Sequence, residues 1–300
     1  GVYGFEVAPD NYALGFQPAN GEFAPGSVTL RFQNQTGSAI STVSVGYKVY
    51  VYNDAAGSNS LNFSYSSDNS NYTPVTALNH TTPAAADAVP GWKAHYKVAT
   101  IPVTVANNGY GYIRWSGATV SGTIFDEVAI DDIVIVATPS SQFATFSGNA
   151  ETFVLAGNAN LSGATIVAGN TEFNNSKLYV GANTVTLNGT VTNNGTGGLS
   201  GGTSSNLIIG GAVNKSLSFD QASAATRTFN NVSISTTTSN TTTLNNDLLV
   251  NGTLFVEVGQ TFNLGTSTLN GTLTTITNNG TIATQNTTTT PVATGKTWGG

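Results

Sequence analysis

The stretch from residue 251 to residue 282, NGTLFVEVGQTFNLGTSTLNGTLTTITNNGTI, decides the fold of the second half of this chain. It alternates small apolar residues with Thr, Asn and Gly, and Glu257 is its one ionisable side chain. Alternation with a period of two predicts β-strands, because successive side chains of a strand point to opposite faces. With so little acid, base or nucleophile, the segment is expected to be a scaffold.

Parts of this stretch recur along the chain. TLNGTVTNNGT at 186–196 returns as TLNGTLTTITNNGT at 268–281, and VNGTL at 250–254 is followed by LNGTL at 269–273. A period of roughly 20 residues is typical of one coil of a parallel β-solenoid, whose coils bury their apolar faces against each other. Leu, Val, Ile and Phe are then expected inside, and Thr, Asn and Gly on the outside or at the corners. A disordered linker or a second sandwich is the alternative, although a linker does not explain the regular alternation.

Composition limits the function classes. Only 8% of the 300 residues are charged, against roughly 25% in an average soluble domain. The formal charge of -6 and the nine Lys and Arg residues argue against a nucleic-acid partner, which requires clustered positive charge. Cysteine is absent, which excludes disulfides, thiolate nucleophiles and cysteine metal sites. The length favours two domains.

The chain has no candidate membrane span. Its longest apolar run, DIVIVA at 132–137, is far shorter than the roughly 18 residues that cross a bilayer and is expected to be a strand. The absence of both sulfur-containing residues and of an initiator residue is typical of a processed piece of an exported protein. We therefore expect a secreted or cell-surface location.

The two halves differ in composition. Residues 1–137 hold five Lys/Arg and ten Asp/Glu, whereas residues 138–300 hold four and five. The domain boundary is predicted in ATPSSQF at 137–143, since Pro and Ser follow the end of an apolar strand there. The sequence predicts a β-sandwich module over 1–139 and Thr/Asn/Gly-rich solenoid repeats over 140–300, continuing beyond this sequence.

The first half shows clear period-two alternation. One strand is marked by Val43, Val45, Tyr47, Val49 and Val51, and further strands by Val28, Leu30 and Phe32, by Leu61, Phe63 and Tyr65, and by Ile113 and Trp115. Such strands, separated by Gly/Asn/Pro/Ser turns, predict an antiparallel, jelly-roll-like sandwich of about eight strands. Because the end of a solenoid exposes unpaired strands, the sandwich is also expected to cap the first coil.

Catalytic residues are not evident. His80 and His95 lie in one short stretch without a metal-binding spacing, and no GxSxG motif marks a nucleophile. The separation of Asp220 and Asp247 does not match the coil length and so does not predict a pair of carboxylates on neighbouring coils. We expect no catalytic site and no enzyme activity.

One acidic cluster suggests a cation. FDEVAIDDI at 125–133 places Asp126, Glu127, Asp131 and Asp132 within seven residues. Four neighbouring carboxylates repel one another unless solvent or a hard cation neutralises them, and oxygen ligands suit calcium. The alternative is that Asp131 and Asp132 bind loop amides while the other two face water. Calcium is the one cofactor that the sequence predicts.

Aromatic residues suggest a sugar-binding surface. A flat platform of rings offers apolar area with polar rims, which suits a sugar ring. The candidates are Trp92, Tyr96, Tyr52, Tyr110 and Tyr112. Trp92, in the loop-like VPGWKAHY, is the strongest of them, although it could instead plug one end of the sandwich, and Trp115 is expected in the core beside Ile113.

Four stretches carry a family resemblance. NYALGFQ at 11–17, SVTLRFQNQTG at 27–37, VYNDAAGSNSLNFSYSSDNSNYTPV at 51–75 and YIRWSGATVSGTIFDEVAIDDIVI at 112–135 resemble β-sandwich modules of secreted, multidomain surface proteins of the Bacteroidota. The resemblance covers nearly all of residues 1–137. It implies export through the outer membrane by the type IX secretion system, with the translocon as a partner, and display on the cell surface.

The repeats are similar to those of large surface adhesins, including those of gliding motility. The first hypothesis is thus a non-catalytic adhesin or stalk segment, with a sandwich that binds surface glycans or other surface proteins. The alternatives are the binding part of a secreted polysaccharide-degrading enzyme and a subunit of an extracellular filament. Modules of this kind accompany several functions, so the resemblance alone does not choose among them.

Overall fold

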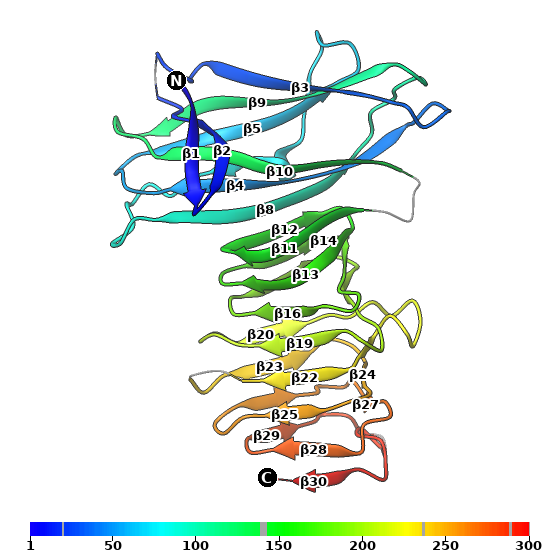
Figure 1. The fold of residues 1–300 in the computed structure, drawn as a ribbon. Helices are drawn as coiled ribbons and strands as arrows, with labels where there is room; N and C mark the ends of the chain where they lie inside the picture. Colours follow the sequence, from blue (N-terminus) through cyan, green and yellow to red (C-terminus); the bar gives the residue numbers. More distant parts are fainter. Residues whose placement is uncertain (20, 139–142, 236–237, 288–289, 300) are drawn as a thin grey trace. The chain divides into compact units, whose positions relative to one another are not determined.

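The structure is a computed structural model with two compact units, Gly1–Ala144 and Thr145–Gly300 (Figure 1). It describes residues 1–19, 21–138, 143–235, 238–287 and 290–299. The predicted boundary at 139/140 lies outside the described residues. The one helical element of the described part is the 3-10 turn η1 (Thr76–Leu78), so the all-β prediction of an antiparallel sandwich followed by a parallel solenoid is confirmed.

No helix in the part of the chain that the structure describes is long and apolar enough to span a bilayer.

Two antiparallel sheets form the first unit. The first sheet has the order β1 (Val2–Ala8), β2 (Asn11–Phe16), β10 (Glu127–Thr138), β4 (Thr42–Tyr52) and β8 (Trp92–Ile101). The second has the order β3 (Gly26–Gln33), β9 (Tyr110–Ser121) and β5 (Ser58–Ser66), with the short strands β6 (Thr73–Pro74) and β7 (His80–Thr81) beside β5.

The core of the sandwich follows the predicted alternation. The five inward residues of β4 are each at most 2% exposed: Val43, Val45, Tyr47, Val49 and Val51. The Tyr47 ring packs against Phe63 and Trp115 of the other sheet, with centroid distances of 5.9 and 5.4 Å. Trp115 is 1% exposed, as expected for the residue that shares a face with Ile113.

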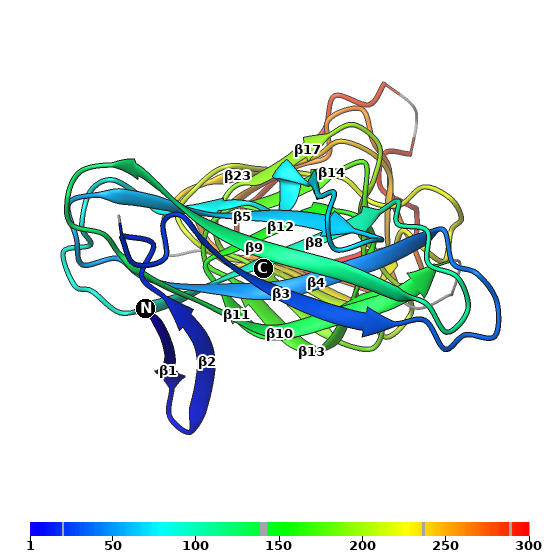
Figure 2. The same cartoon turned by 90° about the horizontal axis from the view of Figure 1, so that it is seen from above.

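The β1–β2 hairpin folds over the outer face of the first sheet. Val7 and Ala13 of the hairpin form a buried cluster with Tyr50 and Ala129, on which Phe5, Trp92 and Ala94 also pack. Figure 2 shows the hairpin projecting from the layered strands of this unit. The hairpin therefore brings side chains of β1 to the ends of β4 and β8.

The second unit is a solenoid with three columns of parallel strands (Figure 1). The first column contains β13 (Ala159–Val167), β16 (Thr184–Leu187), β19 (Asn206–Ile209), β22 (Asn231–Ile234), β25 (Leu254–Val256), β28 (Thr275–Asn278) and β30 (Thr297–Gly299), with β11 (Ala144–Ala150) paired to β13.

The second column has two segments. They are β12 (Thr152–Ala156), β14 (Thr171–Asn174) and β17 (Val191–Asn194), then β20 (Lys215–Leu217), β23 (Thr241–Leu244), β26 (Thr261–Asn263) and β29 (Thr281–Ala283). The third column contains β15 (Lys177–Tyr179) and β18 (Gly198–Ser200), then β21 (Thr228–Phe229), β24 (Leu248–Val250) and β27 (Leu269–Asn270).

Coil length varies around the predicted period. The step from Phe153 to its partner Thr171 is short, whereas the step from Lys215 to its partner Thr242 is clearly longer. Extra residues extend the segments between strands, while the paired strands keep their register. A solenoid tolerates such insertions because each coil contacts only its neighbours.

The sequence repeats do not mark equivalent positions. Leu248 pairs with Leu269, so the VNGTL and LNGTL segments are two residues out of structural register. The longer repeat begins in the first column at β16 and recurs in the third column at β27. The similar segments therefore recur because different corners of the solenoid use the same residue types, Asn, Gly and Thr. They do not mark a strict structural repeat.

Apolar side chains fill the interior of the solenoid, and amides tie the coils together outside it. Phe173, Leu207 and Phe262 are each at most 1% exposed. On the surface, Asn231 Nδ2 donates to Asn206 Oδ1 on the preceding coil at 2.9 Å. This division of apolar and amide side chains matches the prediction.

Two glycines show how closely the coils approach. A Cβ on Gly271, whose φ is +111°, would lie 2.1 Å from the Val250 carbonyl oxygen of the preceding coil. Gly189 has no positive φ, yet its Cβ would lie 1.9 Å from the Gly169 carbonyl oxygen. Glycine is thus required both for turning and for backbone contact between coils.

We predict that Gly271→Ala lowers the free energy of unfolding of the chain by at least about 3 kcal/mol, because strain at positive φ adds to a backbone clash. Gly295→Ala is the matched control. Gly295 has φ +74° and no atom within 4 Å of a built Cβ, so the control should cost only about 1–2 kcal/mol. Urea unfolding measures both, and equal losses would contradict close packing of the coils at Gly271.

Candidate functional site

Two of the five aromatic residues predicted as sugar-contacting candidates lie together. Tyr52, at the end of β4, is the cross-strand partner of Trp92, at the start of β8. Their ring centroids are 5.4 Å apart and the ring planes are inclined by 57°. Both side chains are half-buried, so Trp92 neither plugs the core nor stands free in solvent.

Two residues of β1 extend this pair. The Phe5 ring lies 5.3 Å from that of Trp92, and the Tyr3 ring stacks on Phe5 at 5.3 Å with an interplanar angle of 17°. Tyr3 is 44% exposed and Phe5 is half-buried. We call Tyr3, Phe5, Trp92 and Tyr52 the aromatic row. Tyr3 and Phe5 were not among the predicted aromatics, although their alternation with Val7 indicates a strand face.

Tyr96 is a correction to the sequence prediction. Its side chain is fully buried, and Lys48 Nζ lies 5.0 Å from its ring centroid. A ring without accessible area cannot stack on a sugar, so Tyr96 does not belong to a binding platform. Tyr110 is 41% exposed but lies on β9 of the other sheet, where the Arg31 guanidinium is 4.4 Å from its ring centroid.

The four predicted calcium ligands do not gather into one group. Glu127 Oε1 accepts a hydrogen bond from Gln17 Nε2 at 2.9 Å, and Asp132 Oδ2 pairs with Lys48 Nζ at 2.7 Å. Asp131 Oδ1 accepts from the Asp132 amide at 2.8 Å. Asp126 is fully buried and precedes β10.

An irregularity in β10 contributes to this separation. The pairing of β10 with β4 shifts between Asp131 and Val134, and Asp132 takes a positive φ of 50°. Across the described residues, no three His, Asp or Glu side chains form a group that could hold a metal. The predicted four-carboxylate site is therefore not formed as a unit, while calcium binding itself stays a prediction.

The two histidines form a pair that their spacing did not reveal. His80 in β7 and His95 in β8 have ring centroids 4.4 Å apart, and His80 Nε2 is buried without a hydrogen-bond partner. Desolvation, together with the charges of Lys97 and Lys93, lowers the pKa of His95 to about 4. Desolvation, with His95 and Lys97 nearby, holds the pKa of His80 well below its usual value.

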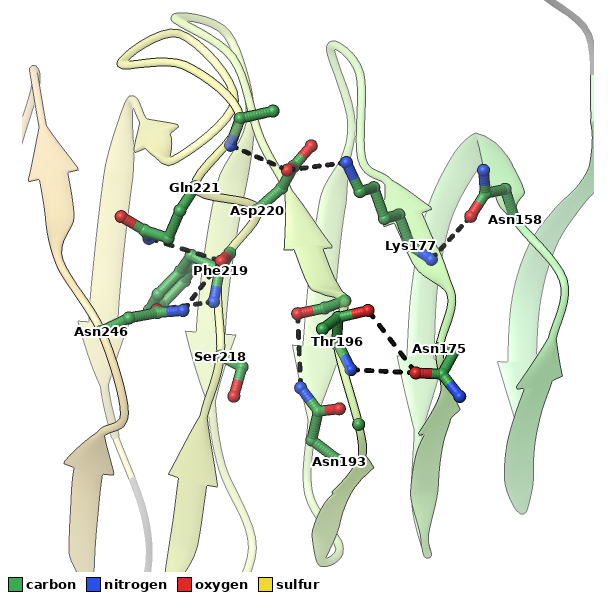
Figure 3. A pocket seen from close by; sticks show the side chains of 13 residues that line it. Asn158, Asn175, Lys177, Asn193, Thr196, Ser218, Phe219, Asp220, Gln221 and Asn246 are labelled. Carbon is green, nitrogen blue, oxygen red and sulfur yellow. Dashed lines mark hydrogen bonds and ion pairs between the residues drawn. The ribbon is translucent and has the colours of Figure 1, made fainter.

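The solenoid carries a polar pocket of about 660 Å³ (Figure 3). Its lining is dominated by amide and hydroxyl side chains from successive coils. The lining residues are Asn158, Asn175, Lys177, Asn193, Gly195, Thr196, Gly197, Ser218, Phe219, Asp220, Gln221, Ala222 and Asn246. Because they lie roughly one coil apart in sequence, no local motif marks the pocket.

An ion pair dominates the electrostatics of the pocket. Lys177 Nζ lies 2.8 Å from Asp220 Oδ1, and Asp220 is only 5% exposed. Burial alone would raise the pKa of the Asp220 carboxyl, but hydrogen bonds from Lys177, the Ala222 amide and Ser200 outweigh it and lower that pKa. The same hydrogen bond to Asp220 raises the pKa of Lys177.

This arrangement is unsuited to proton transfer. Lys177 stays protonated beside Asp220 and so cannot act as a base, and Ser200, 1% exposed, donates to Asp220 Oδ2 at 3.2 Å. Asp247, the other acid considered as a partner of Asp220, accepts from the Thr268 amide at 2.8 Å through Oδ1. The two acids are thus engaged separately.

The amides of the pocket mostly serve the coils. Asn175 Oδ1 accepts from the Thr196 amide at 3.1 Å, and Asn246 Oδ1 accepts from the Phe219 amide at 2.8 Å (Figure 3). Asn193 Oδ1 is the one lining side-chain atom that is buried and unpartnered in the described structure. The pocket can bind a ligand through hydrogen bonds, but most of its amide groups already hold neighbouring coils together.

No family model and no curated protein matches the chain. Among solved structures, the chain is similar to TmCBM61, determined in complex with beta-1,4-galactotriose, at 16% identity and a TM-score of 0.27 over 45% of this chain and 80% of that one. A carbohydrate-binding module specific for non-crystalline cellulose, CBM28, matches at 14% identity and a TM-score of 0.30 over 46% and 82%. Likenesses this remote carry no inference about the ligand of this chain.

We predict that acid destabilises the sandwich through the histidine pair. As the pH falls, His95 takes up its proton near pH 6.5 in the unfolded chain but only near pH 4 in the folded chain. Between these two pH values the unfolded state therefore binds more protons. The contribution of neutral His95 to the free energy of unfolding is therefore complete above about pH 6.5, and it is lost as the pH falls toward 4. The loss should be about 2 kcal/mol, after allowance for solvent screening of a half-buried group.

Urea unfolding of the chain at pH 7.0, 5.5 and 4.5 measures this loss. The variant His80→Gln/His95→Gln serves as the comparison, because glutamine does not titrate. Its stability should change clearly less than that of the original chain across this range. Parallel curves for the two proteins would show that the histidines do not cause the acid sensitivity.

Proposed function

We propose that this chain is a non-catalytic, carbohydrate-binding segment of a secreted surface protein, an adhesin or stalk in which the aromatic row contacts the glycan and the solenoid is a passive spacer. The observation that carries the proposal is the continuous contact of four rings, Tyr3, Phe5, Trp92 and Tyr52, at spacings of 5.3–5.4 Å. Export by the type IX system and display on the cell surface rest on the family resemblance of the sandwich.

The chemistry of the row suits a sugar chain. Aromatic faces provide apolar area with polar rims, and a pyranose ring likewise has C–H faces and hydroxyl edges. The Tyr3 and Tyr52 hydroxyls and the Trp92 indole N–H are polar groups at the edges of these rings. Because four rings follow one another in contact, we propose an oligosaccharide segment as the ligand, in preference to a single sugar.

Charge near the row favours a neutral glycan. Lys93, which follows Trp92, pairs with Asp87 at 2.9 Å between Nζ and Oδ2. This pairing neutralises the cation that adjoins Trp92, so this end of the row offers no unpaired lysine to an acidic sugar. The absence of a clustered positive surface is consistent with the low Lys and Arg content.

The non-catalytic part of the proposal is supported by the solenoid. The polar pocket of the solenoid shown in Figure 3 contains a protonated lysine paired to a buried carboxylate, an arrangement that leaves neither group free to act as acid or base. The binding part of a polysaccharide-degrading enzyme would use the same aromatic row, and would differ in having a catalytic domain elsewhere. That the sandwich caps the solenoid stays a prediction.

The proposal predicts that the chain binds neutral oligosaccharides and that Tyr3→Ala weakens the binding about tenfold, because the change removes one stacking ring. Tyr110→Ala is the matched control. Tyr110 is 41% exposed, close to the 44% of Tyr3, but lies outside the row. A glycan array selects the oligosaccharide, and calorimetric titration of both variants measures the Kd.

Tryptophan fluorescence locates the contact independently. Trp92 is the only tryptophan in the row, so Trp92→Phe should abolish the fluorescence change caused by the bound glycan while retaining an aromatic ring. An array without a single neutral-glycan hit would overturn the proposal. So would equal losses of affinity in Tyr3→Ala and Tyr110→Ala, since binding would then not depend on the row.

A further inference from the structure

Three segments meet at one end of the sandwich beside the aromatic row. The Ala55 amide donates to Asp126 Oδ1 at 3.2 Å, and Asn59 Nδ2 donates to the Asp126 carbonyl oxygen at 2.8 Å. The Asp87 amide donates to the Asn53 carbonyl oxygen at 3.0 Å. These hydrogen bonds join the turn between β4 and β5, the loop that follows β7, and the residue before β10 into one junction.

Apart from Asp87 Oδ2, which has Lys93 Nζ as its ion-pair partner, three side-chain oxygens in this junction are buried without a hydrogen-bond donor. They are Asp126 Oδ2, Asn59 Oδ1 and Asn53 Oδ1. Their residues are 0%, 0% and 3% exposed, so bulk water does not compensate them. A buried acceptor without a hydrogen bond destabilises the folded state. One ligand bound in the junction would supply the missing contact to all three oxygens.

The orientation of the two amides is fixed by their other contacts. Asn53 Nδ2 donates to the Ala85 carbonyl oxygen at 2.9 Å, and Asn59 Nδ2 donates to that of Asp126 at 2.8 Å. Rotating either amide would place its oxygen against a carbonyl oxygen and lose a hydrogen bond. The unpartnered atoms are therefore oxygens, and the junction is rich in acceptors.

Negative charge surrounds these oxygens. The carboxylates of Asp54 and Asp87 lie near enough to repel that of Asp126. The Asp87 carboxylate has Lys93 Nζ as its partner at 2.9 Å. One cation close to Asp126 would relieve both the repulsion and the missing contacts.

We propose that the junction binds one hard divalent cation, calcium, through Asp126 Oδ2, Asn53 Oδ1 and Asn59 Oδ1, with Asp87 as the adjoining carboxylate. Carboxylate and amide oxygens are the ligands that calcium takes, and its flexible shell of six to eight oxygens accepts carbonyls and water at the remaining positions. A proton on Asp126 could satisfy only one of the three acceptors.

This site differs from the one that the acidic motif predicted. It keeps Asp126 and replaces the other three carboxylates with two asparagine oxygens from a distant segment. Glu127 and Asp132 already have Gln17 and Lys48 as partners. Because Asn53 directly follows Tyr52, a bound cation would also fix one end of the aromatic row, yet its test does not depend on glycan binding.

Calorimetry of the EDTA-treated full chain tests the proposal. Calcium at 100 times its Kd should raise the Tm of the sandwich transition by about 5–10 °C. Magnesium should do markedly less, since it prefers a small octahedral shell that keeps several waters. Terbium luminescence, sensitised by the nearby Trp92 and displaced by calcium, should report the same site.

Asp126→Asn and Asp132→Asn form the variant pair. Asp126→Asn should weaken calcium binding at least tenfold. Asp132→Asn, which changes an equally charged residue of the same motif, should leave the Kd for calcium unchanged. If the Asp126→Asn variant does not fold, Asp87→Asn replaces it, and this variant should bind calcium at least threefold more weakly than the original chain. No calcium-dependent shift and no terbium binding in the original chain would overturn the proposal, as would weaker binding in Asp132→Asn alone.

Discussion

Backbone hydrogen bonding between adjacent strands is the interaction on which this molecule depends. With 8% charged residues and no cysteine, the chain has few ion pairs and no cross-links to stabilise it. In the solenoid, a strand within the stack, such as β19, pairs with the coils on either side, which requires glycine wherever a Cβ would meet the neighbouring backbone. Asn side chains between the strands then accept hydrogen bonds from backbone amides that the strands leave unpaired, as Asn175 and Asn231 do.

Scarce charge also shapes what the molecule can do. Lys177 is tied to Asp220, Lys48 to Asp132 and Lys93 to Asp87. Groups held in such pairs are poor acids and bases, and the features on which recognition can rest are aromatic faces and buried side-chain oxygens. Both occur at the same end of the sandwich, where the aromatic row adjoins the junction of Asn53, Asn59 and Asp126. This chemistry is the basis on which we propose a binding role.

Local periodicity predicted much of the fold, while contacts between distant segments set the site. The alternation of β4 marked its buried face correctly, and the recurrence of similar segments about 20 residues apart predicted the solenoid, although these segments are not in structural register. Tyr3 and Phe5 could not be assigned to the row, because only the fold-back of the β1–β2 hairpin brings them to Trp92. Likewise, the acidic motif indicated Asp126 but not the asparagines that meet it, since hydrogen bonds between segments far apart in the chain form that junction.

Hydrogen exchange of the full chain, with and without a bound neutral oligosaccharide, tests most directly whether the aromatic row is the binding surface. The account predicts slower exchange at β1 and at the adjoining ends of β4 and β8, with the solenoid unchanged. Protection confined to the coils around the Lys177–Asp220 pocket would contradict it and would assign glycan binding to the solenoid.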